Sequence, residues 1–406
     1  MTDANQKLQG SLAPFEETIE ATRADREALY KWFHQHPELS LEEVETSNRI
    51  EEEMKRMGYD VISVGKTGKV SVLENGEGPT VLFRADFDAL PLAEETGLVY
   101  AADPELGRMH ACGHDMHTTA LLGAAEALMQ HKDLWSGTFI ALFQPGEETG
   151  HGAIDMVNSG LADAVPEPDI VLGQHVGPLL PNYGMGSLSG PVYTTCVQTK
   201  ITLYGKGSHG SMPHKGIDPV VMAAEVVMAL QTIVSRNIDP KEMTVVTVGA
   251  VHGGKSANTV ADTVELAVST RAYTEEMSNQ LNERIKQIVL GVAQTHGAER
   301  EPTFEIIGGA PEFWNNEEAT ETVMAAFREQ FGDRAGDFGR LGGSEDFPNI
   351  ASAWGAPYYF WFVGSSADIE NAPMNHSPQF APDLQPTLDV ATRTILAGIS
   401  PYLMKK

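Results

Sequence analysis

Residues 138–148 read Thr-Phe-Ile-Ala-Leu-Phe-Gln-Pro-Gly-Glu-Glu, an apolar run that ends in two adjacent carboxylates. The run has the length and composition of a buried strand. Helix-like stretches and a second apolar run surround it, at 118–129, 152–159 and 170–172. Alternation of strands and helices is typical of α/β layered architectures, in which ligands bind at strand ends. The sequence therefore predicts an α/β fold with a functional site near Glu147 and Glu148.

The same architecture extends toward both ends of the chain. Residues 15–57 have a helical pattern that is broken at His36-Pro37. Three short strand-like runs follow, at 61–64, 70–73 and 80–83. After Pro311 we expect a helix, a strand and a final helix, at 317–331, 357–363 and near 387–403.

Between these parts the pattern changes near residue 194. Strands are expected at 197–204, 244–252, 264–271 and 303–307, and helices at 219–235 and 275–296. Their β-α-β-β-α-β order is that of a ferredoxin-like module. A chain of 406 residues also exceeds what one hydrophobic core usually serves. We therefore predict a catalytic three-layer α/β/α domain, formed by 1–193 and 309–406, with an inserted smaller α+β domain at 194–308.

Composition disfavours several classes of function. The formal net charge of −28 opposes binding to nucleic acid or to anionic membranes. No apolar run approaches the roughly 18 residues of a membrane helix, and the N-terminus lacks the pattern of a secretory signal, so we expect a cytoplasmic protein. The chain has two cysteines, Cys112 and Cys196. A reduced compartment with Cys112 as a metal ligand fits better than a disulfide.

Metal-ligand residues gather just before the expected helix 118–129. Residues 109–117 read Met-His-Ala-Cys-Gly-His-Asp-Met-His. Cys112 and His114 are two apart, and in a loop or extended stretch such side chains point the same way, while Gly113 permits a tight path between them. Thiolate, imidazole and carboxylate bind zinc and similar ions, and a nearby carboxylate can take a proton from water. The alternative is a buried cysteine beside a helix cap.

The paired carboxylates suit a division of labour. Adjacent residues on an extended chain point in opposite directions, so one of Glu147 and Glu148 can ligate metal while the other acts as a base; the alternative is a solvated acidic turn. Asp86 and Asp88 close another strand and share one face, where an aspartate can orient a ligand histidine. A turn cap before Pro91 is the alternative for this pair.

Five more polar residues complete the candidate set. His175 follows an apolar strand and His376 lies in a polar loop; each alone is as well explained by a structural role, but two metal ions need ligands in this number. In the inserted module, His209 on a Gly-rich loop can stabilise an oxyanion, and Asn258 and Arg271 can bind a substrate carboxylate. The alternatives are a loop histidine and a surface arginine.

These motifs resemble the metallopeptidase-like amidohydrolases that cleave N-acyl amino acids. That group includes indole-3-acetyl-amino-acid amidohydrolases, hippurate hydrolases and bacterial N-acyl-amino-acid aminoacylases. The matching stretches run in order along nearly the whole chain: RADFDALP (84–91), MHACGHDMH (109–117), FQPGEETGHGA (143–153), GQHV (173–176), SHGSMPHKGIDPV (208–220), ANTV (257–260), GGSEDFP (342–348) and NHSPQF (375–380). Two further stretches, LYKWFHQHPE (29–38) and DLWSGTF (133–139), resemble the N-alpha-acyl-glutamine aminoacylases of this group.

The resemblance implies a binuclear centre with five ligands: Cys112, His114, Glu148, His175 and His376. It implies that Glu147 is the general base and proton shuttle, and that Asp88 orients a metal-binding histidine. Asp86 falls where related peptidases have a ligand histidine, so this branch departs there and Cys112 compensates. The small domain resembles a dimerisation or lid domain, in which His209 and Asn258 contact the tetrahedral intermediate, from the same or the neighbouring subunit, and Arg271 contacts the substrate carboxylate.

We therefore expect a metal-dependent amide hydrolase that cleaves N-acyl amino acids into a carboxylic acid and a free amino acid. Two divalent ions per subunit are expected, zinc first, with manganese, cobalt or nickel as alternatives. A dipeptidase or carboxypeptidase with the same centre is the alternative function; a metal-binding protein without catalysis is disfavoured because Glu147 is present. We expect a homodimer or dimer-based oligomer, with no nucleic-acid or membrane partner.

Overall fold

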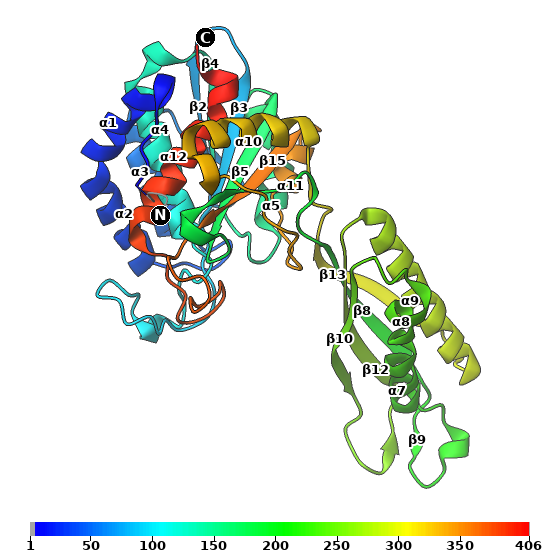
Figure 1. Ribbon diagram of the computed structural model, residues 1–406. Helices are drawn as coiled ribbons and strands as arrows, with labels where there is room; N and C mark the ends of the chain where they lie inside the picture. The colour runs from blue at the N-terminus through cyan, green and yellow to red at the C-terminus, as the bar shows by residue number, and fades with distance from the viewer. Residues whose placement is uncertain (1–4, 406) are drawn as a thin grey trace. The chain divides into compact units, whose positions relative to one another are not determined.

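The computed structural model describes residues 5–405 and forms two compact units (Figure 1). The first unit comprises the residues up to Gly190, then Trp314–Arg340, then the residues from Asp346 onward. The second comprises Pro191–Phe313 and Leu341–Glu345. An α/β domain with an inserted smaller α+β domain is therefore confirmed as the fold class. The domain boundaries predicted from the sequence stay predictions.

The first unit is built on a seven-stranded mixed sheet with the order β1-β2-β4-β3-β5-β15-β6. Its strands are β1 (Ile62–Val64), β2 (Gly68–Asn75), β3 (Thr80–Asp86), β4 (Gly137–Gln144), β5 (Ile170–Gly177), β6 (Met185–Gly186) and β15 (Tyr358–Gly364). Strands β4, β3, β5 and β15 run parallel to one another, whereas β2 and β6 pair antiparallel with β4 and β15. The carboxyl ends of the four parallel strands therefore meet at one edge of the sheet, which is where binding sites form in open α/β folds.

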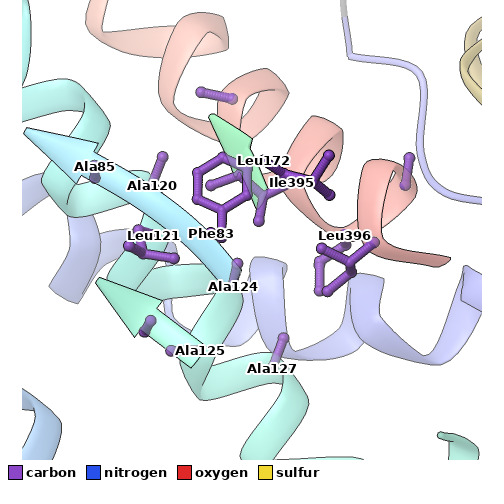
Figure 2. Packing of buried hydrophobic residues seen from close by; sticks show 14 of the residues in the cluster. Phe83, Ala85, Ala120, Leu121, Ala124, Ala125, Ala127, Leu172, Ile395 and Leu396 are labelled. Carbon is purple, nitrogen blue, oxygen red and sulfur yellow. The ribbon is translucent and has the colours of Figure 1, made fainter. Parts of the chain in front are cut away.

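Helices cover both faces of this sheet. They are α1 (Ala13–Ala21), α2 (Arg23–Gln35), α3 (Val44–Arg56), α4 (His114–Gln130), α5 (Gly152–Asn158), α6 (Leu161–Ala164), α10 (Glu317–Phe331), α11 (Pro348–Ser352) and α12 (Leu384–Leu403). On one face, Phe83 and Ala85 of β3 pack against apolar side chains of α4 and α12, as Figure 2 shows. On the other, Phe347 beside α11 packs on Phe360 of β15, with ring centroids 5.0 Å apart.

The second unit has a four-stranded antiparallel sheet with the order β10-β12-β8-β13. Its elements are β8 (Thr195–Tyr204), β9 (Ser208–His209), α7 (Pro219–Leu230), α8 (Thr232–Asn237), β10 (Thr244–Gly253), β11 (Thr259–Val260), β12 (Thr263–Ala272), α9 (Glu275–Thr295) and β13 (Thr303–Ala310). Buried Val226 and Leu281 join α7 and α9 to the sheet strands in one core. The chain order and sheet order are those of the predicted ferredoxin-like module. Two short strands, β7 (Gly190–Pro191) and β14 (Trp314–Asn315), complete the chain.

Two element boundaries differ from the expectation in ways that matter for the site. Helix α4 begins at His114 rather than near Thr118, and β5 continues to Gly177. Histidines and aspartate are weak signals for a helix or strand interior, so the pattern alone excluded them. Among the described residues, no helix is long and apolar enough to cross a membrane.

Candidate metal centre

Cys112 and His114 lie where the loop after β3 enters helix α4. Gly113 is the residue before the helix and has φ of 91°, a left-handed conformation that favours glycine. A Cβ atom at this position would lie 2.5 Å from Cγ2 of Val176. Glycine is therefore required both by the turn and by the close approach of β5. The turn buries Cys112 and His114, which are 7% and 0% exposed.

The His114 imidazole is oriented by an aspartate. Its Nδ1 lies 3.1 Å from Oδ1 of Asp88, so in the neutral ring Nδ1 carries the proton and Nε2 presents a lone pair. That Nε2 is buried and has no hydrogen-bond partner. It lies 3.9 Å from a carboxylate oxygen of Glu147 and 4.0 Å from one of Glu148. Burial would lower the pKa of His114, but Asp86, Asp88 and Glu148 raise it to about 10, so these carboxylates attract positive charge to this position. A divalent cation bound between Nε2 and the carboxylates would supply that charge and leave the ring neutral.

His175, on β5, presents its ring in the same way. Its Nδ1 lies 2.8 Å from the carbonyl oxygen of Val176, which leaves Nε2 as an acceptor, 3.3 Å from Sγ of Cys112. Burial and the neighbouring His117 hold the pKa of His175 well below its usual range. The ring is therefore neutral, as a metal ligand must be.

Glu147 and Glu148 follow the carboxyl end of β4, and here one expectation was wrong. The strand ends at Gln144 and the chain turns at Gly146, whose φ is 59°. Both carboxylates consequently reach within about 4 Å of His114 instead of pointing in opposite directions. Alternation holds only along an extended chain, and this segment is a turn.

His376 comes from the loop before α12 and has φ of 68°. Its backbone N–H donates to the carbonyl of Ala111 at 2.7 Å, and its Nε2 lies 3.4 Å from Oε2 of Glu148. Its side chain is 54% exposed, whereas that of Glu148 is 8% exposed. His376 is thus the solvent-facing member of the cluster.

The predicted ligand residues come together in three overlapping groups, each with its ligand atoms within 4.8 Å of one another. They are Cys112–His114–His175, Cys112–Glu148–His376 and His114–Glu147–Glu148. Thiolate, imidazole and carboxylate together suit zinc and other first-row divalent ions. The buried Oε1 of Glu148, like Nε2 of His114, has no hydrogen-bond partner. Such acceptor atoms suit coordination to a divalent cation, because no hydrogen-bond donor among the described residues reaches them.

The electrostatics of the cluster indicate the same preference. Burial and the charges of Glu148 and Glu147 raise the pKa of the Cys112 thiol well above its usual range. Burial, with Asp88 nearby, raises the pKa of Glu148 to about 7. Each buried carboxylate disfavours the ionisation of its neighbours and of the Cys112 thiol. A cation bound among these groups would favour their ionised forms instead.

The sequence analysis missed His117, which belongs to the same cluster. Its Nε2 accepts a hydrogen bond from the Val176 N–H at 2.8 Å, and its Nδ1 lies 2.6 Å from Oδ1 of Asp86. With both nitrogens engaged, His117 supports the site rather than ligating an ion. Its position one turn beyond His114 on α4 is the signal that could have found it.

Asp86 lies opposite this histidine and is fully buried. Burial alone would raise its pKa, but Arg84, His114 and His117 hold the pKa of Asp86 well below the usual range. Arg84 donates to Oδ2 of Asp86 at 2.6 Å. Asp86 is therefore an ionised partner of Arg84 and His117.

In the second unit, the three predicted residues fall at two ends of the sheet. His209 lies opposite Thr259 in the β9–β11 pair, and the Gly210 N–H donates to the Asn258 carbonyl at 2.7 Å. His209 and Asn258 are thus neighbours, both exposed. Arg271 lies near the far end of β12, where its guanidinium donates to the Gly342 carbonyl at 3.1 Å.

Fold and site together define a metal-dependent hydrolase of the mixed α/β class. Residues 82–397 match peptidase family M20/M25/M40, and the chain belongs to that family. It is 38% identical to N-acetyl-L-cysteine deacetylase of Bacillus subtilis over 73% of this chain and 71% of the relative. It is 36% identical to hippurate hydrolase of Campylobacter jejuni over 79% of this chain and 83% of the relative. These relatives confirm the predicted amidohydrolase branch.

Two further comparisons bear on the activity. Thermostable carboxypeptidase 1 of Saccharolobus solfataricus is 31% identical over 94% of both chains. The crystal structure of the Bacillus subtilis YXEP protein, described as a dinuclear metal binding peptidase of the M20 family, is similar with a TM-score of 0.78 and 27% identity. That similarity covers 94% of this chain and 98% of the other. Both a peptidase and an amidase specificity therefore occur among similar proteins.

Proposed function

We propose that this protein hydrolyses the amide bond of N-acyl amino acids, releasing a carboxylic acid and a free amino acid. The observation that carries the proposal is the buried Nε2 of His114, which has no hydrogen-bond partner and faces the carboxylates of Glu147 and Glu148. The deacetylase and hippurate hydrolase relatives, named for N-acyl amino acid substrates, support this substrate class.

The proposed ligands of two divalent ions are Cys112, His114, Glu148, His175 and His376. Ions held there would supply a water of lowered pKa and a Lewis acid for the acyl carbonyl. Glu147 is the proposed general base, which takes a proton from water and passes it to the leaving amine. Asp88 keeps the His114 ring in the tautomer that leaves Nε2 unprotonated.

His209 and Asn258 are proposed to stabilise the oxyanion, and Arg271 to bind the substrate carboxylate. Within one copy these groups are far apart. Gly205 and Gly207, next to β9, donate to Asp262 at the start of β12, whereas Arg271 lies near the end of that strand. At about 3.3 Å per strand residue the separation is roughly 25 Å, too far for one small substrate. We therefore place His209 and Asn258 in the site of a neighbouring subunit.

A homodimer fits the surface of the second unit. Helix α7 exposes Val220, Val221 and Met228, which is 71% exposed, and β10 is an edge strand of the sheet. Apolar side chains beside an open edge are typical of a surface covered by a second copy. The smaller domain would then serve as the dimerisation and lid domain.

The proposal also covers the identity of the ion, the compartment and the first substrate to assay. Zinc is the proposed ion because Cys112 offers a thiolate, with manganese, cobalt and nickel as alternatives. Hydrolysis is proposed to take place in the cytoplasm. The likeness to N-alpha-acyl-glutamine aminoacylases makes an acyl-glutamine the first substrate to assay. A carboxypeptidase or dipeptidase activity is the second candidate, because a thermostable carboxypeptidase is among the similar proteins.

An assay of amino-acid release tests the proposal. Native, chelated and zinc-restored protein should be compared on N-acetyl, N-benzoyl and N-acyl-glutamine substrates and on dipeptides. We expect cleavage of N-acyl amino acids that chelation abolishes and zinc restores. Preference for dipeptides would favour the second candidate, and cleavage that resists chelation and metal stripping would contradict the metal-dependent reaction.

A further inference from the structure

We propose that Glu43 is a positioning residue that holds the turn from which the proposed base Glu147 projects. The inference rests on the proposed role of Glu147. Glu43 lies at the start of α3, distant in sequence from every metal-ligand motif. Its side chain is nevertheless fully buried and contacts the chain just before the paired glutamates.

One oxygen of Glu43 joins two loops. Its Oε1 accepts hydrogen bonds from the N–H of Gly146 at 2.9 Å and from the N–H of Leu41 at 2.7 Å. Its Oε2 accepts from the hydroxyl of Thr67 at 2.8 Å. All three donors are accounted for by a single buried carboxyl group. Gly146 directly precedes Glu147, so the hydrogen bond at Gly146 fixes the peptide that begins the catalytic turn.

Both clamped backbones are in the left-handed region. Leu41 has φ of 62° and Gly146 has φ of 59°. A non-glycine residue in this region is strained and persists where surrounding contacts hold it. The two turns also touch, because a Cβ at Gly146 would lie 3.1 Å from the Leu41 side chain. The carboxylate of Glu43 supplies the contact that holds both.

The same segment also supports the aspartate that orients His114. The hydroxyl of Ser40 donates to Oδ2 of Asp88 at 2.6 Å, and the N–H of Glu148 donates to that oxygen at 3.0 Å. The loop before α3 therefore contacts the proposed catalytic centre at two points. Ser40 contacts the orienting Asp88, and Glu43 contacts Gly146, the residue before the proposed base.

The geometry makes the choice of side chain specific. Glutamine at position 43 keeps an acceptor for both N–H groups and can donate its amide to the Thr67 hydroxyl. Burial raises the pKa of Glu43 to about 7, so a neutral side chain suits this position. Aspartate is one methylene shorter and cannot reach both loops.

Glu38 provides a matched control. It is a carboxylate on the same segment that accepts from the N–H groups of Val44, Glu45 and Thr46 at the start of α3. Within the described residues, no hydrogen bond joins its side chain to Gly146. Its replacement removes a carboxylate near the same loop and leaves the clamp on the catalytic turn intact.

The experiment compares metal-loaded Glu43→Ala, Glu43→Asp, Glu43→Gln and Glu38→Ala by hydrogen exchange and steady-state kinetics. We expect amide exchange at Gly146 to accelerate about tenfold or more in Glu43→Ala and Glu43→Asp. In those variants kcat should fall by about 10- to 100-fold, with KM and metal content unchanged. Glu43→Gln should restore both protection and kcat, and Glu38→Ala should alter exchange only at the start of α3.

Unchanged exchange at Gly146 in Glu43→Ala would overturn the proposal, as would an equal loss of kcat in Glu38→Ala. If Glu43→Ala fails to fold, the contrast between Glu43→Asp and Glu43→Gln makes the same decision. Exchange does not depend on substrate, so a wild-type protein inactive on N-acyl amino acids would remove the proposed function while exchange still decides whether Glu43 holds the turn.

Discussion

The two units present their candidate functional residues in opposite ways. In the α/β unit, residues from β3, α4, β5 and two loops converge into a buried cluster whose rings are fixed by hydrogen bonds to Asp88 and to the Val176 carbonyl. In the inserted unit, His209 and Asn258 are exposed and lie at one end of the sheet, with Arg271 near the other. The first arrangement is a preorganised centre; the second consists of separate contact points.

The two arrangements suit different tasks. Metal binding requires close, fixed donors, which the carboxyl edge of a parallel sheet supplies. Contacts to a reacting substrate can instead be delivered by a surface that docks against the centre, including one from a second copy. Four experiments test this contrast between the two units, beginning with the metal-ligand cluster.

The largest effect is expected from Glu147→Gln. Losing the proposed base should reduce kcat by about 10²- to 10⁴-fold, because general acid–base catalysis contributes that much. Metal content should stay at the wild-type level, since the five proposed ligands are intact. Kinetics together with metal analysis of the purified variant check both statements. Retention of wild-type kcat would remove Glu147 from the base role.

The inserted unit should give a smaller effect with a distinctive signature. His209→Ala should lower kcat by about 10²-fold, in the range for loss of one oxyanion donor, and Arg271→Ala should raise KM. If His209 acts in the neighbouring site, mixed dimers of the two variants contain one site with both residues. At a substrate concentration well below the KM of Arg271→Ala, where each parent variant has little activity, a refolded equal mixture should therefore recover about a quarter of wild-type activity. Mixing without any recovery would place both residues in the same subunit's site.

His117→Leu tests whether the buried centre depends on support beyond its ligands. Removing the ring takes away the acceptor for the Val176 N–H and the partner of Asp86. We expect metal affinity to fall by about 10- to 100-fold, as it does when outer hydrogen-bond partners of metal sites are lost. His117→Gln can keep one of the two contacts, so its metal affinity should lie between those of the wild type and His117→Leu. Titration with cobalt, followed by its absorption spectrum, measures the affinity; equal affinities would contradict the assignment.

The smallest effect is expected for the stability of the fold near the buried His34, which hydrogen-bonds Asp115 next to His114. Burial would lower the pKa of His34, but hydrogen bonds with Asp115 at 2.7 Å and Glu94 at 3.1 Å raise the pKa of His34 to about 9. A raised pKa stabilises the fold below the unfolded value of about 6.5, and that stabilisation is lost as pH rises through 9. The difference in unfolding free energy between wild type and His34→Gln should therefore shrink by about 1–3 kcal/mol from pH 6.5 to 9.5. Urea titrations at both pH values measure it, and a constant difference would exclude the charged state.

Much of the fold followed from local pattern. The apolar runs at Thr80 and Thr138 became β3 and β4, and the β-α-β-β-α-β order of the module was correct. The ends of elements were less predictable where polar residues continued them, as with His114 at the start of α4 and His175 inside β5. Burial in the tertiary structure offsets the weak propensity of such residues, and no local signal reports that burial.

The candidate site was likewise predictable in its residue types but not in how its side chains are oriented. Residue type and spacing nominated Cys112, His114 and one of the paired carboxylates Glu147 and Glu148 as metal ligands, because few side chains bind divalent ions. The complete set of five proposed ligands, with His175 and His376, followed only from the resemblance to known amidohydrolases. Nothing in the sequence indicated that Glu147 and Glu148 face the same ring, since this depends on a left-handed turn at Gly146. Nor did it associate His117 with Asp86, or Glu43 with Gly146, because each pair joins segments far apart in the chain.

Thiolate, imidazole and carboxylate donors, and an α/β sheet with an inserted α+β module, could be read from the sequence alone. Only the tertiary structure decided which of these groups meet, which tautomer each histidine adopts and which residues support the others. The physical reason is that donor identity is a property of single side chains, whereas orientation and pKa depend on burial and on partners brought close by folding.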